Sequence, residues 1–351
     1  MQILLLSPYE SVSHRHWRTR LQAGLPEVAF KPLVMPPRYF NWRVRGNALM
    51  LAEWLKGESL SEFDQVLATS MTDLATLKGL VPDLARIPSI VYFHENQFAF
   101  PTRGAKAHAV AAQITSIYTA LAADQVVFNS AFNRDTFFEG ANQLLKQMPD
   151  AVPERLLTDC ARKAWVVPVP LATDSPGRNR SNTVRSGIVW NHRWEYDKGP
   201  EQLFEVVKAY LALGGQELVH LVGQQFRQIP EPFSRVIDCL QQAGRLGQSG
   251  YIDDHESYLS LLRECRVVLS TAHHEFQGLA VQEAMAEGCL PVVPDALVYP
   301  EYVPKHSRYE SPEEAAVLLM RQQFSDPISL VDEYSWPKQA PIWRQLFSES
   351  S

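Results

Sequence analysis

Residues 266–295 read RVVLSTAHHEFQGLAVQEAMAEGCLPVVPD. The β-branched runs RVVLST and LPVVPD are typical of buried strands. Between them, the segment that follows Gly278 carries apolar residues at roughly helical spacing, so a glycine turn leads from a strand into a helix. A strand, a helix and a second strand form one repeat of a parallel sheet, and the stretch therefore predicts an α/β fold.

The same alternation runs through the whole chain. Apolar runs in the first half are QILLLS, QVLATS, SIVYFHE, QVVFNS and AWVVPVPL, and those in the second half are GIVWNH, ELVHLVG, GYI, RVVLST and LPVVPD. Residues 172–185, ATDSPGRNRSNTVR, contain no apolar run and have the composition of a linker. We predict two Rossmann-like domains, 1–172 and 186–328, that face each other across a cleft, and a helical tail, 329–351.

Composition narrows the class of protein. The chain has 351 residues and a formal net charge of -6, which argues against non-specific electrostatic binding to nucleic acid or membranes. Its four cysteines are far apart and form no zinc spacing, which favours a reducing compartment. The chain opens with MQILLLSPYE, whose apolar run is too short for a signal peptide or a membrane span. We expect a cytoplasmic protein that does not enter a membrane.

The helix that follows Gly278 is a candidate anion site. Free N–H groups and the helix dipole attract a negative charge, and glycine allows the anion to approach the backbone. Glu275 and Glu283 cannot bind phosphate because ionised carboxylates only accept hydrogen bonds, so they suit the hydroxyls of a sugar and a ribose. Their spacing alone leaves an alternative open, in which Glu275 is a solvated loop acid and Glu283 only a helix-dipole partner.

A second constellation, WNHRWEYDKGPEQLFEVV, begins at residue 190. Arg193 and Lys198 follow a predicted strand, and Pro200 suits the first turn of the next helix. A guanidinium and an ammonium at a strand end can clamp a diphosphate. Alone, such residues are more often solvated surface charges, but an anion-binding helix in the same domain favours the clamp.

Two basic stretches with interleaved aromatics lie in the first half: HRHWRTR, residues 14–20, and RYFNWRVR, residues 38–45. Arginines neutralise phosphates and aromatic rings stack on unpaired bases, as in the recognition of RNA loops. The alternative is a solvated helix face on which Trp17, Phe40 or Trp42 packs into the core. Elsewhere, His94 and Glu95 end a predicted strand and are candidates for a general acid-base pair, but alternation would let only one of them face the cleft. The pairs His14-His16 and His273-His274 lack further ligands at a metal-site spacing.

Several motifs resemble a known family. HEFQGLAVQEA is similar to the two-glutamate signature of retaining GT-B glycosyltransferases of family 4, and HRWEYDKG resembles their phosphate clamp. More narrowly, SHRHW, YFHENQFAFP, VVFNSAFN, VWNHRWEYDK, HHEFQGLAVQEA and LVYPE resemble the tRNA-queuosine α-mannosyltransferase family, in order along most of the chain. The chain departs from many GT-B enzymes in having no glycine-rich loop after its first strand, so contacts there would run through side chains such as Ser13 and His14.

The resemblance implies transfer of mannose from GDP-mannose to queuosine in tRNA, with retained anomeric configuration and no metal. Carried over by position, it implies that Arg193 and Lys198 bind the diphosphate, Glu275 the donor sugar, the amides after Gly278 the phosphates, and Glu283 the ribose. His94 would face the transferred sugar. The expected catalytic residues are His94, Arg193, Lys198 and Glu275, and the expected donor-binding residues are Arg193, Lys198, Glu275, Phe276, Gln277, Gly278, Leu279 and Glu283.

Two alternatives stay open at this point. The first is a family-4 glycosyltransferase that uses another nucleotide-sugar and a lipid or small-glycoside acceptor. The second is a non-catalytic tRNA-binding protein of the same fold. The joint presence of Arg193, Lys198, Glu275 and Glu283 counts against the second, because a protein that only binds RNA needs no donor site.

Overall fold

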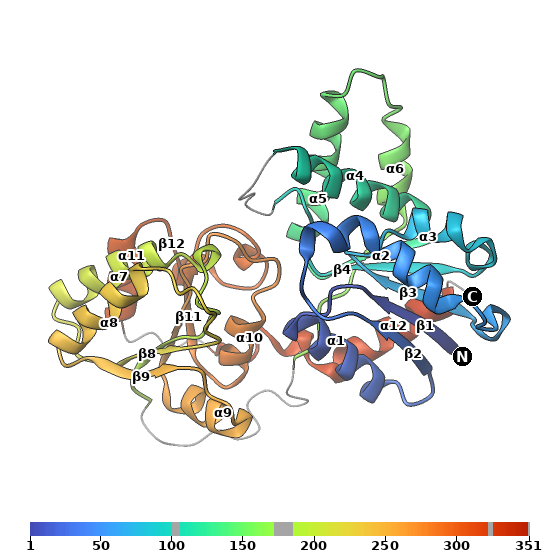
Figure 1. The fold of residues 1–351 in the computed structure, drawn as a ribbon. Coiled ribbons are helices and arrows are strands. Elements are labelled where there is room, and N and C mark those ends of the chain that lie inside the picture. The colour runs from blue at the N-terminus through green and yellow to red at the C-terminus, as the bar shows by residue number, and fades with distance from the viewer. Residues whose placement is uncertain (100–105, 172–184, 322–325, 350–351) are drawn as a thin grey trace. The chain divides into compact units, whose positions relative to one another are not determined.

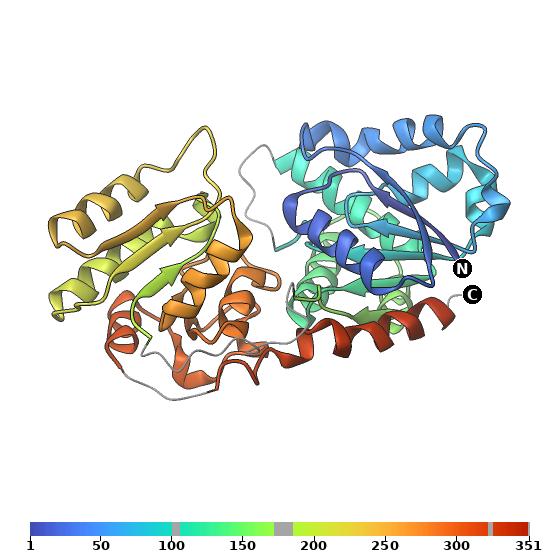
Figure 2. The ribbon, with the colours of Figure 1, turned by 90° about the horizontal axis from the view of Figure 1, so that it is seen from below.

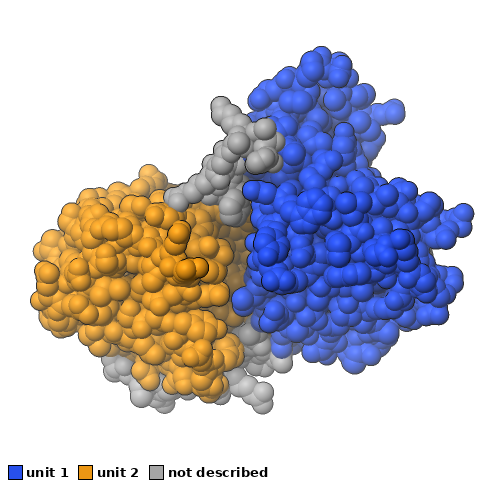
Figure 3. Space-filling model, in the orientation of Figure 1, with its two compact units in different colours: residues 1–170, 336–351 blue, residues 171–335 orange. Residues whose placement is uncertain are grey.

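The structure is a computed structural model that describes residues 1–99, 106–171, 185–321 and 326–349. The chain forms two compact units, residues 1–170 with 336–351 and residues 171–335 (Figure 3). Each unit is built on a six-stranded parallel sheet covered by helices on both faces (Figure 1). The predicted α/β fold with two parallel sheets is confirmed. The predicted linker lies outside the described residues, except for Arg185.

The sheet of unit 1 has the strand order β2-β1-β3-β4-β5-β6. Its strands are β1 (Gln2–Ser7), β2 (Ala29–Val34), β3 (Gln65–Thr69), β4 (Ser89–Phe93), β5 (Gln125–Phe128) and β6 (Ala164–Val166). Its helices are α1 (Val12–Gly24), α2 (Phe40–Leu55), α3 (Leu74–Leu80), α4 (Lys106–Ala122), α5 (Ala131–Lys146), α6 (Arg155–Arg162) and α12 (Trp336–Glu349). Alternate side chains of the strands enter separate cores because successive residues point to opposite faces.

The final helix α12 is part of unit 1 and lies beside α1 (Figure 2). Trp343 of α12 is fully buried and packs against Trp17 of α1 and Tyr92 of β4, at ring-centroid distances of 5.9 Å and 5.5 Å. The opposite face of the sheet carries α2, α3 and α4, whose apolar residues pack on β1, β3 and β4. The C-terminal segment therefore completes the core of the first unit.

The sheet of unit 2 has the strand order β12-β11-β10-β7-β8-β9. Its strands are β7 (Ile188–Trp190), β8 (Val219–Val222), β9 (Leu246–Gly250), β10 (Val267–Leu269), β11 (Leu290–Pro294) and β12 (Arg308–Tyr309). Its helices are α7 (Pro200–Ala212), α8 (Pro232–Gln242), α9 (His255–Glu264), α10 (Leu279–Ala286) and α11 (Pro312–Met320). Residues of α7, α8 and α11 share one core with Trp190 and its neighbouring strands, while α10 packs near β10, β11 and α9.

Three strand predictions need correction, all at sheet edges. The prediction of a strand at GYI is wrong, because β9 ends at Gly250 where that stretch begins. The strands β2 and β12 were not predicted. β2 contains Pro32, which has no backbone N–H to donate, and an edge strand tolerates proline because one of its sides has no neighbouring strand. The edge strands β2, β9 and β12 are only partly buried and lack the continuous apolar run that marks central strands, whereas β6, also at an edge, was predicted from AWVVPVPL.

Candidate functional site

Lys198 is positioned in unit 2 by a tight turn. It ends a single 3-10 turn, Tyr196–Lys198, and Gly199 follows in the left-handed conformation with φ of 64°. A Cβ atom on Gly199 would lie 2.0 Å from the carbonyl oxygen of Thr271, so glycine alone allows this close approach. The Thr271 hydroxyl donates to the Lys198 carbonyl at 2.9 Å. The backbone of Lys198 is thereby held at the carboxyl end of β10.

The Lys198 ammonium meets three acceptors. Its Nζ atom lies 3.0 Å from Oε2 of Glu275, 2.9 Å from the His274 carbonyl oxygen and 3.2 Å from Oδ2 of Asp197. Only 6% of the residue is exposed. Burial lowers the pKa of Lys198, but the neighbouring Glu275 and Asp197 carboxylates together raise it by more, so the net shift of this pKa is upward. Lys198 is therefore a buried cation at neutral pH.

Glu275 is the ionised partner of this lysine. Burial raises the pKa of its carboxyl, but Lys198 outweighs burial and holds that pKa at about 2. Its side chain is only 19% exposed, so the alternative of a solvated loop acid is wrong. A carboxylate in this state accepts hydrogen bonds from hydroxyl groups.

Arg193 lies next to the same cluster but is more open. Its side chain is 48% exposed, with Nη1 2.6 Å from Oε2 of Glu195 and Nη2 3.6 Å from Oδ2 of Asp197. Asp197 thus lies within ion-pair distance of both cations that the sequence assigned to a phosphate clamp. Two cations face three carboxylates, those of Glu195, Asp197 and Glu275. A bound diphosphate would have to compete with these acids for Arg193 and Lys198.

Gly278 forms the turn before α10, with φ of 79°. A Cβ atom there would lie 2.5 Å from the Tyr302 hydroxyl oxygen. That hydroxyl is buried and makes no hydrogen bond among the described residues. The first N–H groups of α10 are also left without helical partners, as at every helix start. The turn therefore combines a positive helix end with a hydroxyl group that is able to meet a polar ligand.

The other residues expected around this turn are packed into unit 2. Phe276 is buried with its ring edge-on to His274, 4.6 Å between centroids, and the buried Gln277 donates from Nε2 to Oε1 of Gln282 at 3.0 Å. Leu279 begins α10 and is half-buried. These three residues form the frame of the turn, so their backbone is the part suited to a ligand.

Glu283 lies in α10, one turn after Gly278, and differs from Glu275 in its electrostatics. Burial raises the pKa of Glu283 to about 7, against a smaller lowering by a hydrogen bond with the Tyr258 side chain. Asn191 supports this arrangement, since its Nδ2 atom donates to the Tyr258 hydroxyl at 2.9 Å and to the Ala280 carbonyl at 2.7 Å. The two glutamates of one motif therefore have opposite pKa shifts.

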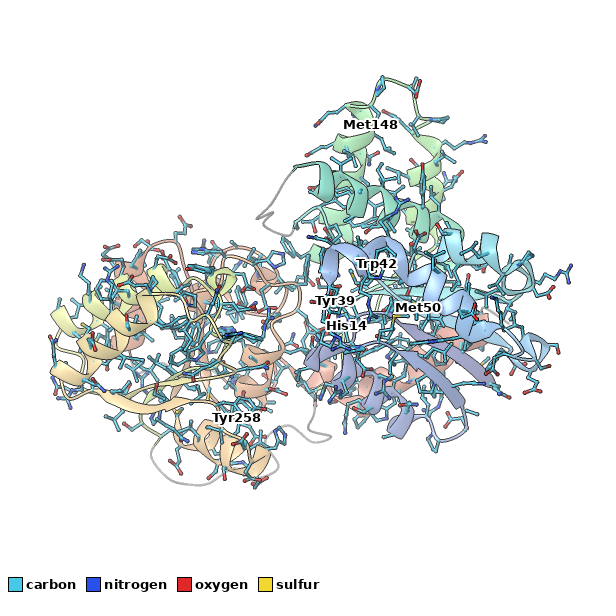
Figure 4. The ribbon with its side chains drawn as sticks, in the orientation of Figure 1. His14, Tyr39, Trp42, Met50, Met148 and Tyr258 are labelled. Atoms are coloured by element: carbon cyan, nitrogen blue, oxygen red, sulfur yellow. The ribbon has the colours of Figure 1, made fainter. Side chains whose placement is uncertain are left out.

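His94 belongs to unit 1, whereas the other predicted site residues belong to unit 2. Its ring stacks on His14 at 4.0 Å and meets the rings of Trp17 and Tyr92 edge-on (Figure 4 labels His14). Burial, and secondarily His14, hold the pKa of His94 well below its ordinary value. Its Nε2 atom makes no hydrogen bond among the described residues. His94 is therefore a neutral imidazole at physiological pH.

The expectation that His94 and Glu95 point to opposite faces is wrong. The strand β4 ends at Phe93, so strand alternation no longer applies to either residue. His14 contacts both, because it stacks on His94 and its Nε2 atom lies 3.1 Å from Oε2 of Glu95. Ser70, just after β3, donates to Oε1 of Glu95 at 2.8 Å. A polar cluster therefore gathers where β3 and β4 end.

The two basic aromatic stretches have different environments. In HRHWRTR, Trp17 is 1% exposed and Arg18 pairs with Glu10 at 2.6 Å, so base stacking by this stretch is wrong and core packing is right. In RYFNWRVR, by contrast, Tyr39 and Trp42 are 67% and 56% exposed. The second stretch alone keeps its aromatic rings on the surface.

Sequence reasoning missed Asp197 and Tyr258 as members of these clusters. Asp197 could have been found, because it precedes Lys198 directly. Tyr258 is on α9, far from both Asn191 and Glu283 in sequence, and no local pattern links the three. Within the ranges that the structure describes, no group of three or more His, Cys, Asp and Glu residues could hold a metal ion. No described helix is long and apolar enough to cross a bilayer.

Comparison with known proteins gives similarity across both units. The family profile described as tRNA-queuosine alpha-mannosyltransferase N-terminal matches residues 2–171. The tRNA-queuosine alpha-mannosyltransferase of Drosophila melanogaster is 33% identical over 319 residues, which span 88% of this chain and 83% of that protein. The match extends well beyond unit 1 into the sheet that carries Lys198 and Glu275.

Solved structures agree on the fold. HepE of Anabaena in complex with UDP has a TM-score of 0.67 at 14% identity, covering 99% of this chain and 100% of that one. A UDP-forming alpha,alpha-trehalose-phosphate synthase of Burkholderia xenovorans has a TM-score of 0.66 at 14% identity, covering 99% and 98%. At this identity the likeness establishes the GT-B fold of two Rossmann-like domains.

Proposed function

Because this chain belongs to the tRNA-queuosine α-mannosyltransferase family, we propose that it transfers mannose from GDP-mannose to queuosine in tRNA with retention of configuration. The observation that carries the proposal is the buried Lys198–Glu275 pair, 3.0 Å apart, in the same unit as the α10 helix start. A cation, a carboxylate and a helix end are the groups needed by a diphosphate joined to a sugar.

In this proposal Arg193 and Lys198 bind the donor diphosphate and stabilise the charge that develops on the leaving group. They would exchange part of their pairing with Glu195 and Asp197 for the phosphates. The amides at the start of α10, together with the Tyr302 hydroxyl, would bind the remaining phosphate oxygens. No metal or cofactor takes part in the proposed reaction.

The two glutamates would bind hydroxyl groups of the donor. Glu275, ionised beside Lys198, would accept hydrogen bonds from the mannose hydroxyls, and Glu283 would hold the ribose. Burial raises the pKa of Glu283 to about 7, so this carboxyl is protonated more readily than that of Glu275. His94 of unit 1 would face the transferred sugar as a neutral imidazole.

Transfer would follow a same-face route. The bond between the anomeric carbon and the phosphate oxygen breaks, and a bond from that carbon to the acceptor hydroxyl oxygen forms on the same face. The acceptor proton passes to the departing phosphate, which leaves as GDP. Charge on this phosphate is what the Lys198 ammonium would stabilise most. The four cysteines are free thiols, which suits the cytoplasm as the proposed compartment.

The test is to incubate the protein with queuosine-containing tRNA and a panel of labelled nucleotide-sugars, including GDP-mannose and UDP-glucose. Digested nucleosides are then weighed by mass spectrometry. We expect one hexose on queuosine, from GDP-mannose, and none on the same tRNA lacking queuosine. Addition from UDP-glucose alone would contradict the donor, and no addition from any donor would contradict the acceptor reaction.

Two variants test the site. Lys198→Met and Glu275→Gln should each reduce transfer by at least about a hundredfold, because each removes a charge from the proposed donor site. Lys208→Met, a change to a lysine that is 52% exposed on α7, is the matched control. Normal transfer by both site variants would show that the donor binds elsewhere.

A further inference from the structure

One face of α2 in unit 1 exposes apolar and basic side chains together. Trp42 and Leu49 are each 56% exposed, although apolar side chains of a helix that packs on a sheet usually turn inward. Residues three and four positions apart share a side of a helix, so one row runs along this surface. We name it the α2 face: Arg38 and Tyr39 before the helix, and Trp42, Arg45, Gly46 and Leu49 within it.

Gly46 shapes the position of Trp42. A Cβ atom on Gly46 would lie 2.5 to 2.8 Å from the central ring atoms of the Trp42 indole. The indole therefore rests directly on the helix backbone, in a place that any side chain at position 46 would fill. More than half of Trp42 nevertheless remains exposed. The result is a flat aromatic ring that is supported from below and open above, which suits stacking by another planar group.

Tyr39 precedes this platform in a strained conformation. Its φ of 59° and ψ of 47° put a non-glycine residue in the left-handed region, and the residue is 67% exposed. The Arg38 guanidinium lies over that ring, 5.5 Å from its centroid. Figure 4 shows Tyr39 and Trp42 together at the start of α2. Strain of this kind is often found at binding sites, because the surrounding fold must maintain it.

The residues on and around the α2 face are basic rather than acidic. Between Val28 and Ala52 the sequence has no acidic residue, whereas Lys31, Arg38, Arg43 and Arg45 are basic, in a chain of net charge -6. Arg43 and Arg45 donate to the Pro8 carbonyl and to the Thr115 hydroxyl, both at 3.4 Å. None of the three arginines pairs with a carboxylate among the described residues. The α2 face is a local basic surface that suits a polyanion.

We propose that the α2 face binds a single-stranded loop of RNA, with an unpaired base stacked on Trp42 and backbone phosphates on Arg38 and Arg45. Arginines beside open aromatic rings match a ligand that alternates phosphates with planar bases. The inference rests on the proposed function only for the identity of that RNA, the queuosine-containing loop of the tRNA.

The test measures binding of a fluorescent RNA hairpin with an unmodified loop, by anisotropy, at two salt concentrations. Trp42→Ala should weaken binding by about tenfold, the usual effect of losing one stacked base, and Trp42→Phe by less. The double variant Arg38→Ala with Arg45→Ala should weaken hairpin binding more at low salt than at high salt. Gly46→Ala should weaken binding several-fold without lowering the melting temperature, since alanine is the better helix former but displaces the indole.

Trp54→Ala is the matched control, because Trp54 is also exposed on α2 but lies outside the α2 face and beside Glu53. It should bind the hairpin within about twofold of the native protein. Equal binding by the Trp42 and Trp54 variants would overturn the proposal. So would Trp42-dependent sedimentation with phosphatidylglycerol vesicles, or a Trp42-dependent dimer in light scattering, when hairpin binding is unchanged.

The two proposals fail separately. If the native protein adds mannose to tRNA, and the Trp42→Ala variant binds the hairpin and transfers mannose equally well, then RNA binding by the α2 face is wrong and the proposed function stands. If hairpin binding depends on Trp42 but the native protein adds no sugar to queuosine, the proposed function is wrong and the α2 face stands.

Discussion

The Nζ atom of Lys198 lies 3.0 Å from Oε2 of Glu275, and both side chains are largely withdrawn from water. The Lys198 ammonium also donates to the His274 carbonyl oxygen, which holds it beside the Glu275 carboxylate. Asp197 supplies a second negative charge to the same ammonium. Lys198 is therefore a buried cation shared by two carboxylates, and in the proposed function a diphosphate would compete with them for it.

Removing the lysine should cost stability as well as activity. Lys198→Met leaves Glu275 and Asp197 without their buried cation, and we expect a loss of about 3 kcal/mol in the free energy of unfolding. Urea unfolding at pH 7 measures this loss. Lys208→Met removes a surface lysine 2.9 Å from Glu205 and should change stability by less than about 1 kcal/mol. Equal losses for the two variants would contradict a special role for the buried pair.

The contribution of the Lys198–Glu275 pair to the free energy of unfolding should depend on pH. The pKa of Glu275 is about 2 in the folded protein and 4.5 as its ordinary value. A lowered carboxyl pKa stabilises the fold above pH 4.5, and this contribution is lost as the pH falls through about 2. The stability difference between the native protein and Glu275→Gln should therefore shrink over that interval. A difference that stays constant from pH 6 to pH 3 would argue against the ion pair.

Glu283 should behave in the opposite sense. Burial raises its pKa to about 7, so folding favours the protonated acid and stability declines as the pH rises from 4.5 to 7. Glu283→Gln carries no charge at any pH and should gain stability relative to the native protein over that interval, with a constant difference above it. Melting temperatures at pH 5 and pH 8 test this. The variant should also raise the KM for GDP-mannose if Glu283 binds the ribose.

His14 should position His94. His14→Ala removes the ring that stacks on His94 and also the partner of Glu95, so we expect kcat for mannosyl transfer to fall by about tenfold. The KM for GDP-mannose, the proposed donor, should change little, because we propose that the donor binds to unit 2. Arg15→Ala, on the exposed side of the same helix, is the control. A change in KM alone would place His14 with the donor.

The C-terminal helix should be essential to unit 1. Trp343 is fully buried against Trp17 and Tyr92, and Trp343→Ala should reduce the free energy of unfolding by about 4 kcal/mol. Arg344→Ala, which removes an exposed pair with Glu27, should cost less than about 1 kcal/mol. Similar melting curves for both variants would show that α12 is an appendage.

Local patterns predicted the central strands and the helix starts. The apolar runs at β1, β3, β4, β5, β7, β10 and β11 are buried on both faces, so composition alone marks them. Gly278 and Pro200 marked the starts of α10 and α7 because glycine allows the turn and proline has the dihedral angle of a first helical residue. The edge strand β9 reads LGQSG and lacks this signal, so the strand was misplaced onto GYI.

The sequence by itself determined the α/β architecture, the family and the residue types of the candidate site, because strand periodicity, turn chemistry and ordered motifs are local. Only the tertiary structure decided the charge states and the neighbours. Glu275 and Glu283 are eight positions apart in one motif, but Lys198 reaches the first and burial beside Tyr258 governs the second. Likewise Trp17 and Trp42 both lie among arginines, and packing against Tyr92 and Trp343 buries only the first. A pKa and an exposed surface depend on atoms brought close by folding, which local patterns do not encode.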